Sequence, residues 1–189
     1  MNRKKITFVF NAPVILCFVI ACFGVLLLNQ FTGGATNPRF FMTYHSSLSN
    51  LMTYVRFFTH VLGHSGWEHF IANMVYILLL GPMLEEKYGS WTILEVILAT
   101  ALATGLINYF FFPKVALLGA SGICFAFIIL SSLTSFKKGE IPITFILVAA
   151  MFIGQQVLDG LFASDNISQM AHIVGGSIGA LFGFMLTKH

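Results

Sequence analysis

Six long apolar stretches follow one another along the chain, separated by short polar segments. They occupy residues 13–28, 69–85, 91–112, 119–136, 141–161 and 167–187. A membrane-spanning helix needs about 20 predominantly apolar residues, whereas a spanning strand needs about 10 residues of alternating polarity. These stretches are too long for strands and do not alternate. The pattern therefore predicts an all-α integral membrane protein, with six transmembrane helices in a single domain over residues 1–189.

The N-terminal part of the chain allows a second interpretation. Arg3, Lys4 and Lys5 precede the first stretch, as in a signal peptide, and Gly33 and Ala35 resemble a weak cleavage site. The apolar stretch is at the long end for that role, so we expect a helix of the domain. The connection 29–68 mixes aromatic and polar residues, which predicts short helices partly immersed in the outer leaflet.

Composition and charge add an orientation to this picture. The chain is 57% hydrophobic and 9% charged, whereas soluble domains carry about 25% charged residues. If both termini are cytoplasmic, the inner side collects seven basic residues and the outer side three: Arg3, Lys4, Lys5, Lys87, Lys137, Lys138 and Lys188 against Arg39, Arg56 and Lys114. The positive-inside rule then predicts a multi-pass protein of the cell (inner) membrane with cytoplasmic termini. Nothing in the composition indicates nucleic-acid binding.

Three of the predicted helices carry a polar residue at the same distance from a charged end. Each lies sixteen positions before its charge, in the pairs His69 and Glu85, Ser121 and Lys137, and His172 and Lys188. Sixteen helical residues span about 24 Å, and the hydrocarbon core is about 30 Å thick. The spacing therefore predicts a serine and two histidines at one depth, nearer the outer face, and suggests hydrolysis within the membrane.

The serine lies in the sequence Gly119-Ala-Ser121-Gly122 at the start of a short apolar stretch. Flanking glycines allow a sharp turn and leave the hydroxyl uncrowded. Free N–H groups at a helix start could stabilise an oxyanion. Small residues also suit close helix contacts, so packing alone remains an alternative. Cys124, one turn later, is interpreted as a packing residue.

The second candidate is His172, because histidine inside a membrane span is costly and usually functional. Gly175 and Gly179 form a small-residue face that would let this helix approach another closely. If that neighbour carries Ser121, the imidazole would lie within about 2.6–3.2 Å of the hydroxyl. A structural histidine, bonded across helices, is the alternative.

His69 and Asn73 share one helix face, and both could donate to an oxyanion together with the Ser121 amide. Hydrogen bonds from these two side chains to neighbouring loops fit the pattern equally well.

His60 and His64 invite a zinc hypothesis, but the His-Glu-x-x-His pattern is absent. Structural hydrogen bonds are therefore favoured for both, and no cofactor or metal is expected. The acids Glu95, Asp159 and Asp165 are not convincingly placed. The residues thus predict a Ser–His dyad.

Taken in order, several fragments resemble the rhomboid intramembrane serine proteases, in their compact six-helix bacterial form. The fragments are residues 56–64, His69 to Asn73, 85–90, 119–122, and Ala171-His172 with Gly175 and Gly179. The resemblance implies a rhomboid-like bundle with Ser121 as nucleophile and His172 as general base and acid. It implies an oxyanion site of His69, Asn73 and the Ser121 amide, and substrates that are transmembrane segments of single-span proteins, cut near their outer ends.

The same resemblance implies that Arg56 belongs to a structured first loop and that Glu85 ties the inner turn. It also implies that the fifth helix and the loop Leu161 to Gln169 act as gate and cap. Two residues depart from the usual family pattern: Val55 replaces an aromatic, and Phe125 replaces a tyrosine that stacks on the catalytic histidine. The rival hypothesis is a catalytically inactive rhomboid-like protein that binds transmembrane helices; a transporter is disfavoured because no internal repeat is visible.

Overall fold

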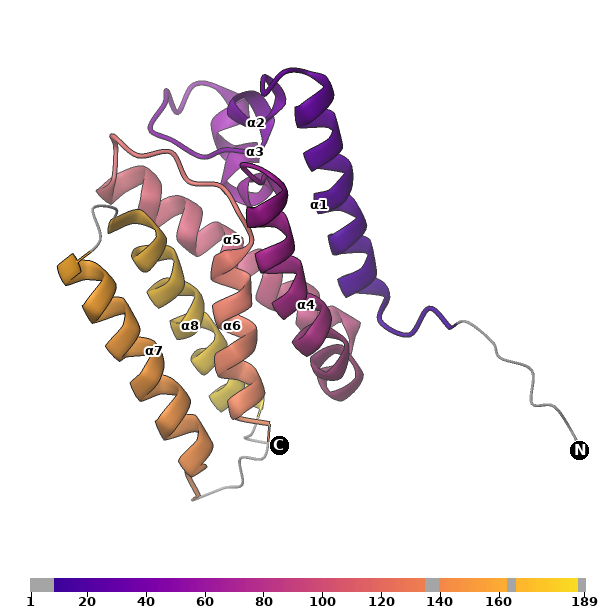
Figure 1. Ribbon diagram of the computed structural model, residues 1–189, viewed down its shortest axis with the longest axis vertical. Coiled ribbons are helices and arrows are strands. Elements are labelled where there is room, and N and C mark those ends of the chain that lie inside the picture. Colours follow the sequence, from indigo (N-terminus) through magenta and orange to yellow (C-terminus); the bar gives the residue numbers. More distant parts are fainter. Residues whose placement is uncertain (1–8, 135–139, 163–165, 187–189) are drawn as a thin grey trace, which may run out of the picture.

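The computed structural model describes residues 9–134, 140–162 and 166–186 (Figure 1). These ranges contain eight α-helices and one 3₁₀ helix. In chain order they are α1 (Pro13–Phe31), α2 (Thr36–Phe40), α3 (Leu51–Thr59), η1 (His60–Leu62), α4 (Trp67–Tyr88), α5 (Ser90–Phe111), α6 (Ser121–Ser132), α7 (Ile143–Phe162) and α8 (Asn166–Leu186). The prediction of an all-α protein is confirmed.

Each predicted apolar stretch coincides with a helix, but some predicted ends are wrong. Among the described residues, α1, α4, α5 and the Gln169–Leu186 part of α8 are long and apolar enough to cross a membrane. α6 begins at Ser121 rather than at Gly119, because Gly119 adopts a φ of 118° that no α-helix contains. It ends at Ser132, before the predicted end at residue 136. The predicted loop from Leu161 to Gln169 is also too long, since Phe162 ends α7 and Asn166 begins α8.

The outer surface of the bundle suits lipid rather than water. Large apolar side chains lie exposed along several helices, among them Ile71, Val75, Leu79, Trp91, Phe111, Met151, Leu181 and Met185. Soluble proteins rarely expose continuous apolar surface on this scale.

The short helices predicted in the connection 29–68 are present, among them α2 and α3. Leu51, Tyr54 and Phe58 of α3 face outward, as expected for a segment partly immersed in the membrane.

α6 lies in the interior of the bundle, in contact with α4, α5, α7 and α8 (Figure 1). Its residues Ile123, Phe127 and Leu130 are fully buried. The contact with α8 is the closest, because Gly175 and Gly179 leave no side chain between the backbones. A Cβ at Gly175 would overlap the carbonyl oxygen of Gly122, and one at Gly179 would overlap that of Ala126. The predicted glycine contact is thus confirmed, and its partner is the helix that carries Ser121.

The first loop is fixed by Arg56, which is buried despite its charge. Its guanidinium donates to the Tyr44 hydroxyl at 2.6 Å and to Ser46 Oγ at 2.9 Å, and it lies over the Tyr44 ring at 4.2 Å. These contacts hold the loop although Val55 provides no aromatic ring. Thr43 and Leu117 exchange two backbone hydrogen bonds of 2.9 and 2.8 Å, so the same loop holds the segment that leads into α6.

Glu85 fastens α1 to the end of α4. Its buried carboxylate accepts the backbone N–H groups of Val14 and Ile15, each at 3.0 Å, and the Ser90 hydroxyl at 2.7 Å. The first N–H groups of a helix have no partner within it, so this carboxylate caps α1. The implied role of Glu85 in tying the turn between α4 and α5 is confirmed by the bond to Ser90, and it extends to a second helix, α1.

We expect Glu85→Ala to destabilise the protein. The variant leaves two buried N–H groups and the Ser90 hydroxyl without their acceptor, which costs about 2–4 kcal/mol of unfolding free energy. The measurement is thermal unfolding in detergent, with Glu86→Ala as the matched control because Glu86 is exposed. Equal unfolding temperatures for the two variants would contradict the capping role.

Candidate active site

Ser121 is the first residue of α6, and the sequence placed it near the start of this helix. Three backbone hydrogen bonds fix the turn at its start: Gly119 N–H donates to the His60 carbonyl at 2.9 Å, and Ala120 O accepts from the N–H of Ile123 and of Cys124 at 2.9 and 3.0 Å. Gly119 has the left-handed φ that glycine tolerates best. The Ser121 N–H group has no acceptor within the helix, so it is available to a bound group.

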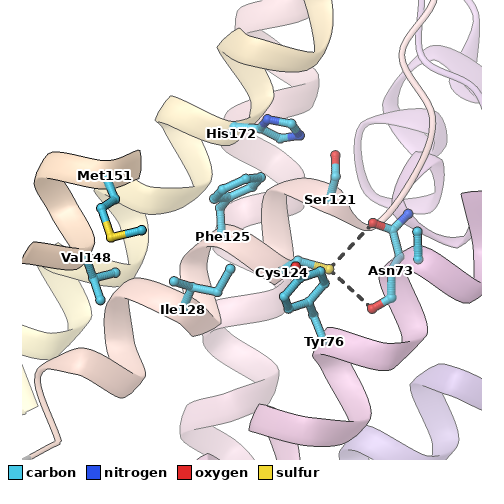
Figure 2. Close-up of a pocket in the computed structure, with 10 residues that line it drawn as sticks. Asn73, Tyr76, Ser121, Cys124, Phe125, Ile128, Val148, Met151 and His172 are labelled. Carbon is cyan, nitrogen blue, oxygen red and sulfur yellow. Dashed lines mark hydrogen bonds between the residues drawn. The ribbon is translucent and has the colours of Figure 1, made fainter. Parts of the chain in front are cut away.

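Ser121 and His172 line one pocket of about 370 Å³. Figure 2 shows the Ser121 hydroxyl and the His172 imidazole at the same end of this pocket, on α6 and α8 respectively. The close approach of these two helices at Gly122 and Gly175 sets how far apart the side chains lie. The structure therefore brings together the two residues that the sequence proposed, and a direct hydrogen bond between them stays a prediction.

Phe125 packs on the His172 imidazole, with the ring centres 4.1 Å apart and the planes inclined by 37°. This contact is the one expected of the family's tyrosine. The substitution therefore removes a hydroxyl and keeps the aromatic face against the histidine, as the sequence suggested.

His69 and Asn73 approach the backbone just before Ser121. A Cβ built on Gly119 would lie 2.7 Å from His69 Nε2 and 3.8 Å from Asn73 Nδ2. Because Gly119 has no side chain, the His69 imidazole can lie against the backbone there, and the Asn73 nitrogen lies nearby. Asn73 Nδ2 is buried and has no hydrogen-bond partner among the described residues. A buried amide without a partner is costly, so this nitrogen is suited to a transient acceptor.

His60 and His64 have structural contacts instead. His60 bonds to the Arg56 carbonyl at 3.1 Å and to Thr104 Oγ1 at 3.2 Å, and His64 bonds to the Leu62 carbonyl at 3.1 Å. Burial lowers the pKa of His60 to about 4. Burial and the nearby His69 lower the pKa of His64 to about 4 as well. Both are neutral at pH 7, and the favoured structural interpretation is confirmed by these bonds.

The sequence did not indicate the other residues that line the pocket. They come from α4, α6 and α7, and are Ala72, Tyr76, Cys124, Ile128, Val148 and Met151. Tyr76 could have been expected, because it lies one turn after Asn73 on the same helix face. The contribution of α7 could not, since nothing in its apolar pattern marks a particular face. Of the acids considered, Glu95 is exposed on α5, and Asp165 lies outside the described residues.

Comparison with known proteins identifies the class. The family model of the rhomboid domain matches residues 52–189, so the chain belongs to the rhomboid family, which contains serine proteases. It is an integral, multi-pass membrane protein.

Individual relatives are distant. Rhomboid protease GluP of Bacillus subtilis is 29% identical over 190 residues, which cover 96% of this chain and 34% of GluP. Rhomboid protease GlpG of Haemophilus influenzae is 26% identical over 137 residues, 70% of each chain. Rhomboid-like protein 11, chloroplastic, of Arabidopsis thaliana is 24% identical over 153 residues, 74% of this chain and 55% of the relative. The chain thus spans about half of that relative's length, and these relatives include both proteases and proteins named only as rhomboid-like.

Proposed function

We propose that this protein is an intramembrane serine endopeptidase that cleaves transmembrane segments of single-span membrane proteins. The observation that carries the proposal is the shared pocket of Ser121 and His172, at the point where α6 and α8 touch. A serine nucleophile needs a base within reach, and a packed aromatic ring orients this one. Membership of a family that contains serine proteases supports the same conclusion.

The residues suggest the order of steps. Ser121 Oγ attacks the carbonyl carbon of the scissile peptide while His172 takes its proton. The developing oxyanion lies near the start of α6, where the Ser121 N–H, His69 and Asn73 donate to it; both side chains lie close to Gly119. His172 then gives the proton to the leaving amine as the C–N bond breaks. Water, activated by His172, hydrolyses the acyl-enzyme and restores the serine hydroxyl.

The substrate helix enters from lipid between α4 and α7. Support comes from a second groove of about 480 Å³, bordered by α4, the end of α6 and α7. It shares Tyr76, Ile128 and Val148 with the active-site pocket, so the two cavities adjoin along the bundle. A peptide bond in an intact helix is shielded, hence segments weakened by glycine or serine should be preferred.

The orientation that accompanies this proposal follows from the basic residues. With both termini cytoplasmic in the inner membrane, the start of α6 lies toward the outer face, and cleavage occurs near the outer end of the substrate helix. The first loop, α2 and α3 would then rest in the outer leaflet.

The decisive experiment is reconstitution in liposomes with a model single-span protein. The wild-type protein is expected to release two fragments, with the cut inside the transmembrane segment near its outer end. Binding of the substrate without cleavage would instead support the catalytically inactive rhomboid-like alternative. Cleavage only in the soluble parts of the substrate would contradict an intramembrane site.

A further inference from the structure

Cys124 contacts Asn73 across the interface between α6 and α4. Its thiol donates to two oxygens of that residue, the backbone carbonyl at 3.4 Å and the side-chain Oδ1 at 3.6 Å. Figure 2 shows both contacts. Cys124 is 3% exposed and Asn73 is 6% exposed, so water does not compete for either group. Buried cysteine is usually a small packing residue, but here the thiol bonds to the side chain that borders the active site.

The two ends of the Asn73 carboxamide have different surroundings. The carbonyl end faces the Cys124 thiol, while the nitrogen lies toward Gly119, without a hydrogen-bond partner in the part of the chain that the structure describes. An asparagine side chain reverses these ends by a half-turn of its amide. That reversal would place the oxygen beside Gly119, where it would repel a developing oxyanion. By donating to the carbonyl oxygen, the Cys124 thiol favours the orientation of the Asn73 carboxamide in which its N–H groups point toward the proposed oxyanion.

We propose that Cys124 is a positioning residue, whose thiol holds the carbonyl end of the Asn73 carboxamide and so directs its nitrogen toward Gly119 and the start of α6. The role of this contact in catalysis rests on the proposed protease function, in which Asn73 stabilises the oxyanion. Cys124 itself touches neither the attacking oxygen nor the departing amine in this scheme. The packing interpretation of the residue is therefore incomplete, because an apolar side chain could pack there without a donor.

The first test is a double-mutant cycle on substrate cleavage. Cys124→Val is expected to lower kcat about three- to tenfold, the worth of one ordinary hydrogen bond, with KM unchanged. In the Asn73→Ala background the same substitution should have no further effect, whereas in the His69→Ala background it should have its full effect. Cys22→Val is the matched control, because Cys22 is an equally buried thiol on α1 that bonds to the Val61 carbonyl.

The cycle separates positioning from packing. A merely structural cysteine would give losses that add to those of Asn73→Ala, or a loss in unfolding temperature with kcat unchanged. Either result overturns the proposal, and so does full activity in Cys124→Val.

The second test does not need activity. Cys17→Ala with Cys22→Ala leaves Cys124 as the sole thiol of the chain, and its S–H stretching band is measured by infrared spectroscopy in detergent. We expect Asn73→Val to shift this band, because an acceptor of the thiol proton is removed. An unchanged band overturns the proposal. If the band shifts while the wild-type protein cleaves no substrate, the proposed function fails and the contact between Cys124 and Asn73 still stands.

Discussion

Ser121→Ala is expected to abolish proteolysis, with a loss of about 10⁴-fold or more in the rate of substrate cleavage. The proposed chemistry has no second nucleophile, so the variant should also take up no label from a fluorophosphonate, which reacts with activated serines. His172→Ala should lose labelling too, because the hydroxyl is then without its base. The measurement is labelling of the purified protein in detergent, together with cleavage in liposomes.

A matched control for these variants is Ser177→Ala. Ser177 lies exposed on α8, one turn beyond His172, and its hydroxyl donates to the Ile173 carbonyl at 2.8 Å. It should label and cleave like the wild-type protein. Equal labelling of the wild type, Ser121→Ala and His172→Ala would remove the dyad from consideration.

Gly175→Ala is expected to separate α6 from α8 and to lower both activity and stability. The added Cβ would overlap the Gly122 carbonyl oxygen, which belongs to the helix backbone and has no freedom to turn aside. Overpacking of this kind costs about 1–3 kcal/mol. A displacement of about 1 Å between reacting groups costs roughly 10²-fold in rate. Since Ser121 precedes Gly122 directly, the cleavage rate should fall more than the unfolding temperature suggests.

The control for this prediction is Gly24→Ala on α1. No heavy atom of the described residues lies within 4 Å of a Cβ added there. Alanine also has the better helix propensity, by about 1 kcal/mol. Gly24→Ala should therefore keep full activity and unfold at the same or a higher temperature. Full activity in Gly175→Ala would show that the close contact between the helices does not set the geometry of the site.

The sequence predicted the helices better than it predicted how they meet. Apolar stretches mark helices because burial in lipid demands them, yet they do not mark ends. The start of α6, just after Gly119, depends on the backbone angle φ of that glycine, which composition does not reveal. Similarly, the spacing of Gly175 and Gly179 indicates a close helix contact, whereas the structure identifies α6 as the helix that makes it with α8.

The residues of the pocket likewise differ in whether the sequence marks them. Ser121, His172 and Asn73 could be proposed because a polar group in a membrane span is expensive and invites a functional explanation. Apolar and weakly polar neighbours carry no such signal. Met151 and Val148 resemble the rest of α7. A buried cysteine such as Cys124 indicates packing, and the sequence does not reveal its contact with Asn73, which lies 51 positions away in the chain.

The attachment of α1 to Glu85 has a consequence for dissecting the protein into parts. The family match begins at residue 52, so α1 lies outside it, although it supplies the two N–H groups that this carboxylate accepts. A fragment trimmed to the matched region would lack α1. Its Glu85 carboxylate would then be buried without the two N–H donors, or solvent would have to enter the space that α1 leaves. The structural contacts that hold the matched region therefore extend beyond its boundary to α1.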